Sequence, residues 1–76
     1  MQEADVTVDA RGMSCPMPVL MAAKAAKGLS AGQKMLIQAT DNGARSDIPA
    51  WCNQTGNELL ESEEADGVLS FVVGKK

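Results

Sequence analysis

Histidine and tyrosine are both absent from this chain of 76 residues. Without histidine, the sequence lacks the usual general base of enzymes and a common ligand of zinc. An acid–base partner, if one is needed, must therefore be a carboxylate, a lysine or a cysteine. The net charge of −3 argues against non-specific nucleic-acid binding, because such binding needs an excess of positive charge.

Cysteine is scarce, and long hydrophobic runs are missing. Cys15 and Cys52 are the two cysteines, and they are too far apart for a Cys-x-x-Cys pair. No signal peptide is recognisable, so we expect a reducing compartment and free thiols, although one disulfide is possible in principle. No segment has the apolar length of a transmembrane helix, which favours a cytoplasmic protein. The length predicts one domain, residues 1–76, too small to enclose a large pocket.

The stretch Arg11-Gly12-Met13-Ser14-Cys15-Pro16-Met17-Pro18 joins an apolar segment to a helical one. Pro16 lacks an N–H and has a helix-like φ, so we place it at the first helical position and Cys15 at the N-cap. Unpaired N–H groups and the helix dipole would then favour the thiolate and lower the pKa of Cys15. The alternative is an unreactive, buried cysteine. The polar approach through Gly12 favours a surface turn.

The first helix is predicted over residues 16–27, with Gly28 as its stop. One face carries small apolar residues that would let the helix lie close to a sheet, namely Val19, Ala22, Ala23 and Ala26. The other face places methionine and leucine beside Cys15, which is typical of surfaces that meet several partners. Alternatively, Leu20 and Met21 lie under a neighbouring loop. This candidate docking face consists of Met17, Leu20, Met21 and Lys24.

Apolar alternation and apolar runs predict strands at residues 5–9, 34–40, 57–64 and 68–73. Asp66-Gly67 is a hairpin signal between the last two strands. A second helix is capped by Ser46 or an earlier residue and ends at Gly56. Its apolar face, Ile48, Trp51, Cys52 and Thr55, makes Cys52 a predicted core residue rather than the reactive thiol.

The predicted element order is βαβαββ. Two strands joined by a helix run parallel, with a right-handed connection. The strands at 34–40 and 68–73 are the most apolar and should be central, whereas the charged strands at 5–9 and 57–64 should be edges. The spatial order is then first, second, fourth, third. The result is an α+β, two-layer sandwich, with a four-stranded mixed sheet and two helices on one face.

Two stretches of the chain resemble the TusA/SirA-type sulfur-carrier family. The first is the acidic Asp9 followed by Gly12 and a Cys-Pro-x-Pro that opens a helix. The second runs over residues 39–52, where Asp47-Ile48-Pro49 opens the second helix, and residues 55–60 are similar as well. Cys-Pro-x-Pro alone is a weak signal, but both motifs at this spacing are a specific one. The resemblance covers nearly the whole chain.

The resemblance implies the same sandwich fold and a sulfur-carrier or sulfurtransferase function. Cys15 would hold sulfane sulfur as a transient persulfide, with no other cofactor and no metal, and Gly12, Pro16 and Pro18 would shape the motif. Met13, Ser14 and Met17 occupy variable positions that would tune partner choice. The implied donor is a cysteine desulfurase or a rhodanese. The implied acceptor is a DsrE-type relay protein in tRNA thiolation or sulfur oxidation, without direct nucleic-acid contact, while other members sit beside a membrane permease for thiosulfate.

The residues suit this chemistry, and they leave alternatives open. A populated thiolate needs no general base, and a buried Cys52 would not attack the persulfide. Arg11 either adds positive charge near the sulfur or is a solvated loop arginine. Two other functions remain possible: a thiol–disulfide module that uses Cys15 and Cys52, or a non-catalytic interaction or regulatory domain in which Cys15 only caps the helix.

Overall fold

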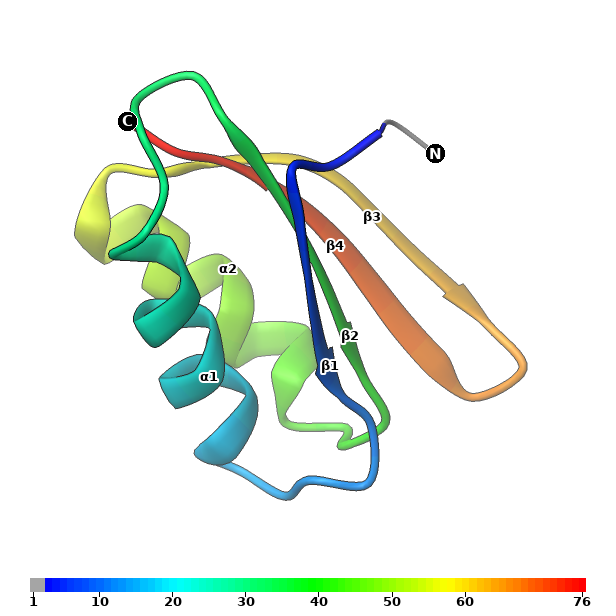
Figure 1. Cartoon of the computed structure of the whole chain (residues 1–76). Coiled ribbons are helices and arrows are strands. Elements are labelled where there is room, and N and C mark those ends of the chain that lie inside the picture. Colours follow the sequence, from blue (N-terminus) through cyan, green and yellow to red (C-terminus); the bar gives the residue numbers. More distant parts are fainter. Residues whose placement is uncertain (1–2) are drawn as a thin grey trace.

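The computed structural model describes residues 3–76, and it shows two layers, a sheet and a pair of helices (Figure 1). The element order βαβαββ is the predicted one. The elements are β1 (Val6–Ala10), α1 (Met17–Ala26), β2 (Lys34–Ala39), α2 (Ala44–Thr55), β3 (Glu58–Ala65) and β4 (Val68–Gly74).

The sheet has the strand order β1-β2-β4-β3, which confirms the predicted arrangement of central and edge strands. β1 runs parallel to β2, with Val8 opposite Ile37. β4 lies antiparallel to both of its neighbours, and Ile37 faces Phe71 across the centre of the sheet. Ile37 is fully buried and Phe71 nearly so, because apolar side chains at the middle of the sheet are covered on the side of the helices.

Both helices cover the same face of the sheet, as predicted (Figure 1). Ala22 and Ala26 of α1 are buried, so small side chains let this helix approach the strands closely. Ile48, Trp51 and Cys52 form the buried face of α2, as predicted. Thr55 lies at the exposed end of α2 instead, where its hydroxyl donates to the Trp51 carbonyl.

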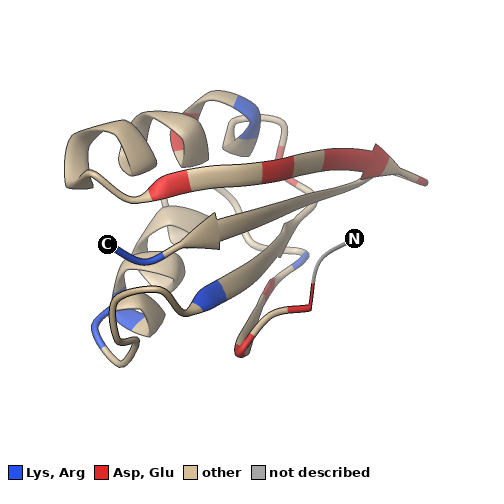
Figure 2. Ribbon diagram, turned by 90° about the horizontal axis from the view of Figure 1, so that it is seen from above, with Lys and Arg blue, Asp and Glu red and all other residues tan. Residues whose placement is uncertain are grey.

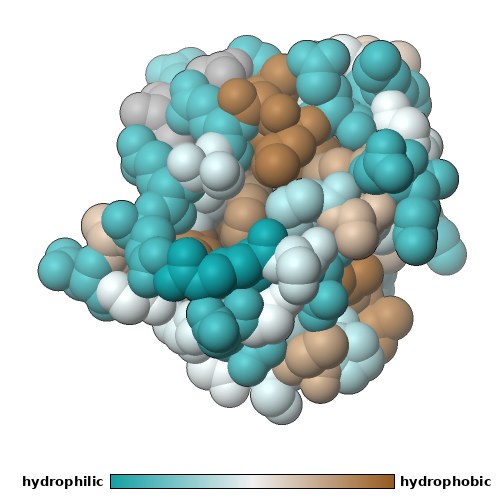
Figure 3. Space-filling view, turned by 180° about the vertical axis from the view of Figure 1, so that it is seen from behind, coloured by the Kyte–Doolittle hydropathy of each residue, from teal (hydrophilic) through white to brown (hydrophobic). Residues whose placement is uncertain are grey.

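Within residues 3–76, no helix covers the other face of the sheet. Strand alternation places Leu36 of β2 and Val72 of β4 on that face, opposite each other in the register. Val72 is nevertheless fully buried. Seen from behind, the molecule shows an apolar patch bordered by hydrophilic side chains (Figure 3).

The start of α1 differs from the prediction by one residue. Pro16 is the N-cap, with φ −98° and ψ 17°, and the helix begins at Met17. Leu20 donates its N–H to the Pro16 carbonyl, while Met17 donates to the Ser14 carbonyl and closes a turn ahead of the helix. Cys15 therefore precedes the N-cap, and the predicted Cys15 N-cap is wrong. Pro18 occupies the first turn of α1 and is buried.

The remaining boundaries agree with the predictions to within a few residues. The N-cap of α2 is Gly43, one of the residues before Ser46 that the prediction allowed. Gly56 ends the helix, as predicted, with a left-handed φ of 76°. Asp66 and Gly67 both have positive φ, 52° and 78°, as a two-residue hairpin between β3 and β4 requires. β3 carries four of the ten acidic side chains of the chain, and they line one edge of the sheet (Figure 2).

Candidate functional site

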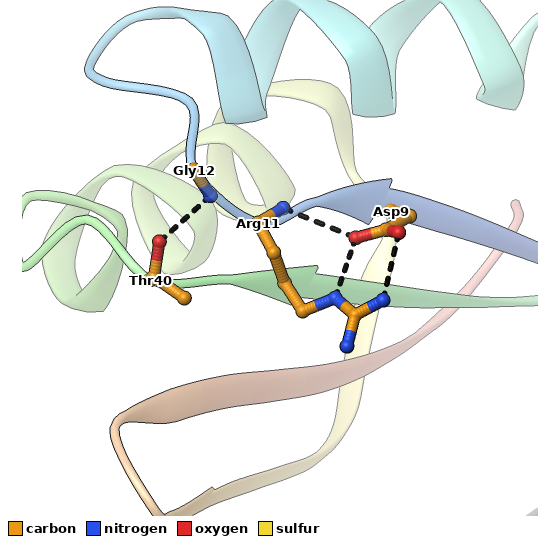
Figure 4. Close-up of polar contacts among 4 residues, drawn as sticks. All are labelled: Asp9, Arg11, Gly12 and Thr40. Atoms are coloured by element: carbon orange, nitrogen blue, oxygen red, sulfur yellow. Dashed lines mark hydrogen bonds and ion pairs between the residues drawn. The ribbon is translucent and has the colours of Figure 1, made fainter.

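Cys15 lies where the loops after β1 and β2 meet. Because β1 and β2 are parallel, their carboxyl ends reach the same edge of the sheet. Gly12 donates its N–H to Thr40 Oγ1 at 2.8 Å (Figure 4). Cys15 donates its own N–H to Asp41 Oδ2 at 3.3 Å. The loop that carries Cys15 is thus held against the loop that leads into α2.

The thiol of Cys15 is exposed and donates a hydrogen bond to a carboxylate. Cys15 Sγ lies 2.8 Å from Asp47 Oδ2, and Asp47 belongs to the first turn of α2. This hydrogen bond raises the pKa of the thiol, and desolvation and the negative charges of Asp47 and then Asp41 act in the same direction. The prediction that a helix N-terminus would lower this pKa is therefore wrong. Cys15 precedes the N-cap, and the nearby acidic side chains dominate.

Gly43 allows the acidic side chains to approach Cys15 this closely. A Cβ at Gly43 would lie 2.9 Å from Asp41 Oδ2 and 3.6 Å from the Cβ of Cys15. Gly43 also donates its N–H to Asp41 Oδ2 at 3.2 Å. Asp41 therefore bridges the backbone of Cys15 and the N-cap of α2, and Gly43 leaves space for that bridge.

Arg11 points to Asp9. Its Nε lies 2.8 Å from Asp9 Oδ1 and its Nη2 lies 3.0 Å from Oδ2, so the contact is bidentate (Figure 4). These hydrogen bonds lower the pKa of Asp9 to about 2. The pair is exposed, and the groups that shift the pKa of Cys15 do not include Arg11. The Arg11 guanidinium therefore pairs with Asp9 at the surface. This arrangement favours the interpretation of Arg11 as a solvated loop arginine over the interpretation that it adds positive charge near the sulfur.

An open hollow of about 280 Å³ lies beside Cys15, with walls from both helices. Pro16 and Val19 of the α1 side and Trp51 of α2 line it, together with the Cys15 and Asp47 side chains. Such a hollow is too open to enclose a substrate, but it leaves the sulfur within reach of another protein.

The predicted docking face is partly exposed. Met17 is 42% exposed and Leu20 is 54% exposed, and Met13 in the preceding loop adds a further exposed methionine. Met21 is half-buried and packs against the core, whereas Lys24 is exposed. Leu20 is therefore available for contact, and the idea that Leu20 lies under a loop is wrong.

The second cysteine is a core residue, as predicted. Cys52 is only 2% exposed, and burial raises the pKa of its thiol. Both cysteines are free in the structure. Among residues 3–76, no cluster of three or more histidine, cysteine or acidic side chains is arranged to hold a metal ion. No helix in the same part of the chain is long and apolar enough to cross a membrane.

Sequence reasoning missed the roles of Asp41, Gly43 and Asp47. The resemblance to the family includes Asp47 only as part of the Asp-Ile-Pro motif. A usable signal was present in the predicted topology, because two parallel neighbouring strands end at one sheet edge and bring their following loops together. That argument places residues 41–47 near residues 11–15. It does not show which carboxylate faces the sulfur, because this depends on the side-chain geometry.

Comparisons with known proteins agree with this architecture. The family model described as sulfurtransferase TusA matches residues 6–75. The sulfur carrier protein TusA of Allochromatium vinosum is 43% identical over 75 residues, covering 99% of each chain. A putative sulfur carrier protein of Neisseria meningitidis is 44% identical over 70 residues, covering 92% of this chain and 95% of its own.

A solved structure is also similar. The SirA-like protein from Desulfitobacterium hafniense superposes with a TM-score of 0.80 at 30% identity, over 91% of this chain and 95% of that one. The fold and the accessible thiol describe a small α+β protein of the sulfur-carrier class. The chain belongs to the TusA family of sulfurtransferases.

Proposed function

We propose that this protein accepts sulfane sulfur on Cys15 as a persulfide and passes it to a protein acceptor. The observation that carries the proposal is the accessible thiol of Cys15, which belongs to the Cys-Pro-x-Pro sequence described above. Relatives similar over nearly their whole length bear the name sulfur carrier protein. The buried thiol of Cys52 is far less accessible to a partner.

The loading reaction is a thiol exchange without net oxidation. The proton leaves the Cys15 thiol, and the thiolate attacks the outer sulfur of a donor persulfide. A sulfur–sulfur bond forms to Cys15 while the sulfur–sulfur bond of the donor breaks. The departing donor thiolate takes up a proton. Delivery to the acceptor is the same exchange, with Cys15 as the leaving thiol.

Direct handover requires docking, and the best candidate surface is the face of α1 next to Cys15. Met17 and Leu20 are exposed there, and Lys24 adds a positive charge two turns into the helix. Adaptable methionine side chains suit a surface that meets more than one partner. Gly12, Pro16 and Pro18 support this surface indirectly, because they shape the loop and the first turn of α1.

The proposed donor is a cysteine desulfurase or a rhodanese, and the proposed acceptor is a DsrE-type relay protein. The pathway would be tRNA thiolation, sulfur oxidation or related sulfur trafficking in the cytoplasm. An alternative role is to take sulfur from thiosulfate beside a membrane permease, and it would use the same cysteine. The identity of the sulfur donor therefore distinguishes this role from that of a carrier loaded by another protein. A thiol–disulfide function has less support, because Cys52 is buried while Cys15 is exposed.

The direct test is the intact mass of the protein after incubation with candidate donors. One sample receives a cysteine desulfurase with cysteine, and a second receives thiosulfate. We expect the wild type to gain one sulfur atom that reductant removes, and the Cys15→Ser variant to gain none, because its hydroxyl cannot form a persulfide.

Cys52→Ser provides the matched control and should load like the wild type. No adduct with any donor would favour a non-catalytic interaction domain. An adduct that persists in Cys15→Ser but is absent from Cys52→Ser would show that the carrier cysteine is Cys52.

A further inference from the structure

We propose that Asp47 restrains Cys15: its carboxylate holds the thiol proton, keeps the free protein poorly nucleophilic and disfavours the anionic persulfide. The second half of this inference, on the persulfide, rests on the function proposed above. The first half concerns the thiol alone and holds or fails independently of any sulfur donor.

The geometry supports a direct effect of Asp47 on the sulfur. The distance of 2.8 Å between Cys15 Sγ and Asp47 Oδ2 is that of a short hydrogen bond, in which the thiol donates and the carboxylate accepts. Deprotonation would replace this hydrogen bond with two anionic groups in contact. The hydrogen bond therefore favours the thiol over the thiolate, and the thiolate is the nucleophilic form.

The surroundings of Cys15 strengthen the effect. From the loop before α2, the Asp41 carboxylate accepts the N–H of Cys15, and it adds a second negative charge near the sulfur. In the described part of the chain, the nearest arginine in sequence, Arg11, is engaged by Asp9, and Arg45 is engaged by Asn42 and Glu64. The charged groups that shift the thiol are thus Asp47 and Asp41, which are both acidic.

A restrained thiol has a consequence for each state of a carrier. Before loading, a suppressed thiolate reacts slowly with small electrophiles and oxidants. After loading, the terminal sulfur of the persulfide is anionic and lies near the same carboxylates, so repulsion favours its transfer to an acceptor. A donor that presents a cationic side chain to Asp47 would relieve the restraint during docking.

The experiment is the pH dependence of Cys15 alkylation by iodoacetamide, followed by mass spectrometry of the peptide that contains Cys15. The rate rises with pH as the thiolate forms, and a raised thiol pKa moves this rise to higher pH. Asp47→Asn keeps the side-chain shape but removes the charge. We expect the profile to move to lower pH and the rate at pH 7 to increase at least about threefold.

Controls separate restraint from altered folding. Asp41→Asn removes the charge that has the smaller effect on the thiol and should move the profile less, while Asp66→Asn, in the β3–β4 turn, should not move it. Circular dichroism must show that each variant is folded. An unchanged profile in Asp47→Asn would overturn the proposal, and a slower reaction would show instead that Asp47 acts as a general base.

A second measurement addresses the persulfide. The loaded protein is mixed with glutathione, which takes the outer sulfur as glutathione persulfide and leaves the Cys15 thiol. At equilibrium we expect a larger persulfide fraction in Asp47→Asn than in the wild type. A smaller or equal fraction would overturn this half of the inference. If neither protein loads, the proposed function fails while the alkylation result still stands.

Discussion

The chemistry of Cys15 is decided by a few atoms around its sulfur. Its backbone N–H donates a hydrogen bond to Asp41, and its thiol donates one to Asp47. Both hydrogen bonds join segments that are distant in the sequence. Gly43 lies between them without a side chain. The position of Cys15 close to a helix start is therefore not sufficient to predict its pKa, because the hydrogen bond to Asp47 and the nearby acidic charges raise that pKa.

Gly43→Ala should disturb the site although its backbone conformation, with φ −62°, suits any residue. The added Cβ would lie 2.9 Å from Asp41 Oδ2, so the carboxylate must move and its bond to the Cys15 N–H weakens. We expect a marked shift of the Cys15 amide resonance and a loss of about 1 kcal/mol in the free energy of unfolding.

Gly28→Ala is the matched control, because its Cβ would meet only the Ala25 carbonyl at an ordinary 3.6 Å. It should leave the Cys15 amide unchanged. An unshifted Cys15 amide in Gly43→Ala would show that Asp41 does not hold the loop.

At the scale of elements, the two helices have different tasks. α2 supplies the core residues Ile48 and Trp51 and brings Asp47 to the sulfur. α1 packs through Ala22 and Ala26 and leaves Met17 and Leu20 exposed beside the Cys15 loop. Small residues on the packed face and large apolar ones on the exposed face reverse the usual pattern, which supports a contact role for α1.

The docking role of α1 predicts that Leu20→Glu and Lys24→Glu slow loading. Leu20→Glu removes an apolar side chain that would contact an apolar partner surface. Lys24→Glu reverses a positive charge that would attract an acidic partner surface. Each change should therefore weaken binding of the donor. We expect the rate of persulfide formation from a cysteine desulfurase, followed by intact mass, to fall by at least about tenfold in the double variant.

Asn53→Glu introduces the same side chain at an exposed position of α2 and should load normally. Circular dichroism should show that the double variant and Asn53→Glu are folded, since the changed residues are exposed. Unchanged loading of the double variant from every donor would place the docking surface elsewhere.

On the scale of the whole molecule, stability depends on a single small core between the sheet and the helices. Ile37 of β2 and Ile48 of α2 both belong to this core, and both side chains are fully buried. A domain of this size buries little other apolar surface, so the loss of a contact in this core is not compensated elsewhere. Ion pairs such as Arg45 with Glu64, which joins α2 to β3, are exposed and contribute little.

Ile37→Val should lower the free energy of unfolding by about 0.5 to 1.5 kcal/mol, since it removes one buried methylene at the centre of the sheet. Urea denaturation followed by circular dichroism measures the change. Leu20→Ala, at a side chain that is 54% exposed, should cost no more than about 0.5 kcal/mol. Equal losses in the two variants would mean that the core does not dominate stability.

Local patterns in the sequence were enough to predict the element order, the central and edge strands and the family. These features depend on local periodicity, on turn residues such as Asp66 and Gly67, and on motifs that are continuous in the chain. The burial of Cys52 followed from its helical spacing with Ile48 for the same reason. Exposure of the Cys15 loop was predictable from its polar residues.

Three features depend on contacts between distant or neighbouring side chains that the folded chain creates: the start of α1 at Met17, the pairing of Arg11 with Asp9 and the acidic environment of Cys15. The thiol and Asp47 lie 32 positions apart in the sequence, and they meet because parallel strands deliver their loops to one edge. Whether a carboxylate then lies at hydrogen-bond distance from a sulfur depends on a few tenths of an ångström, which no local pattern encodes.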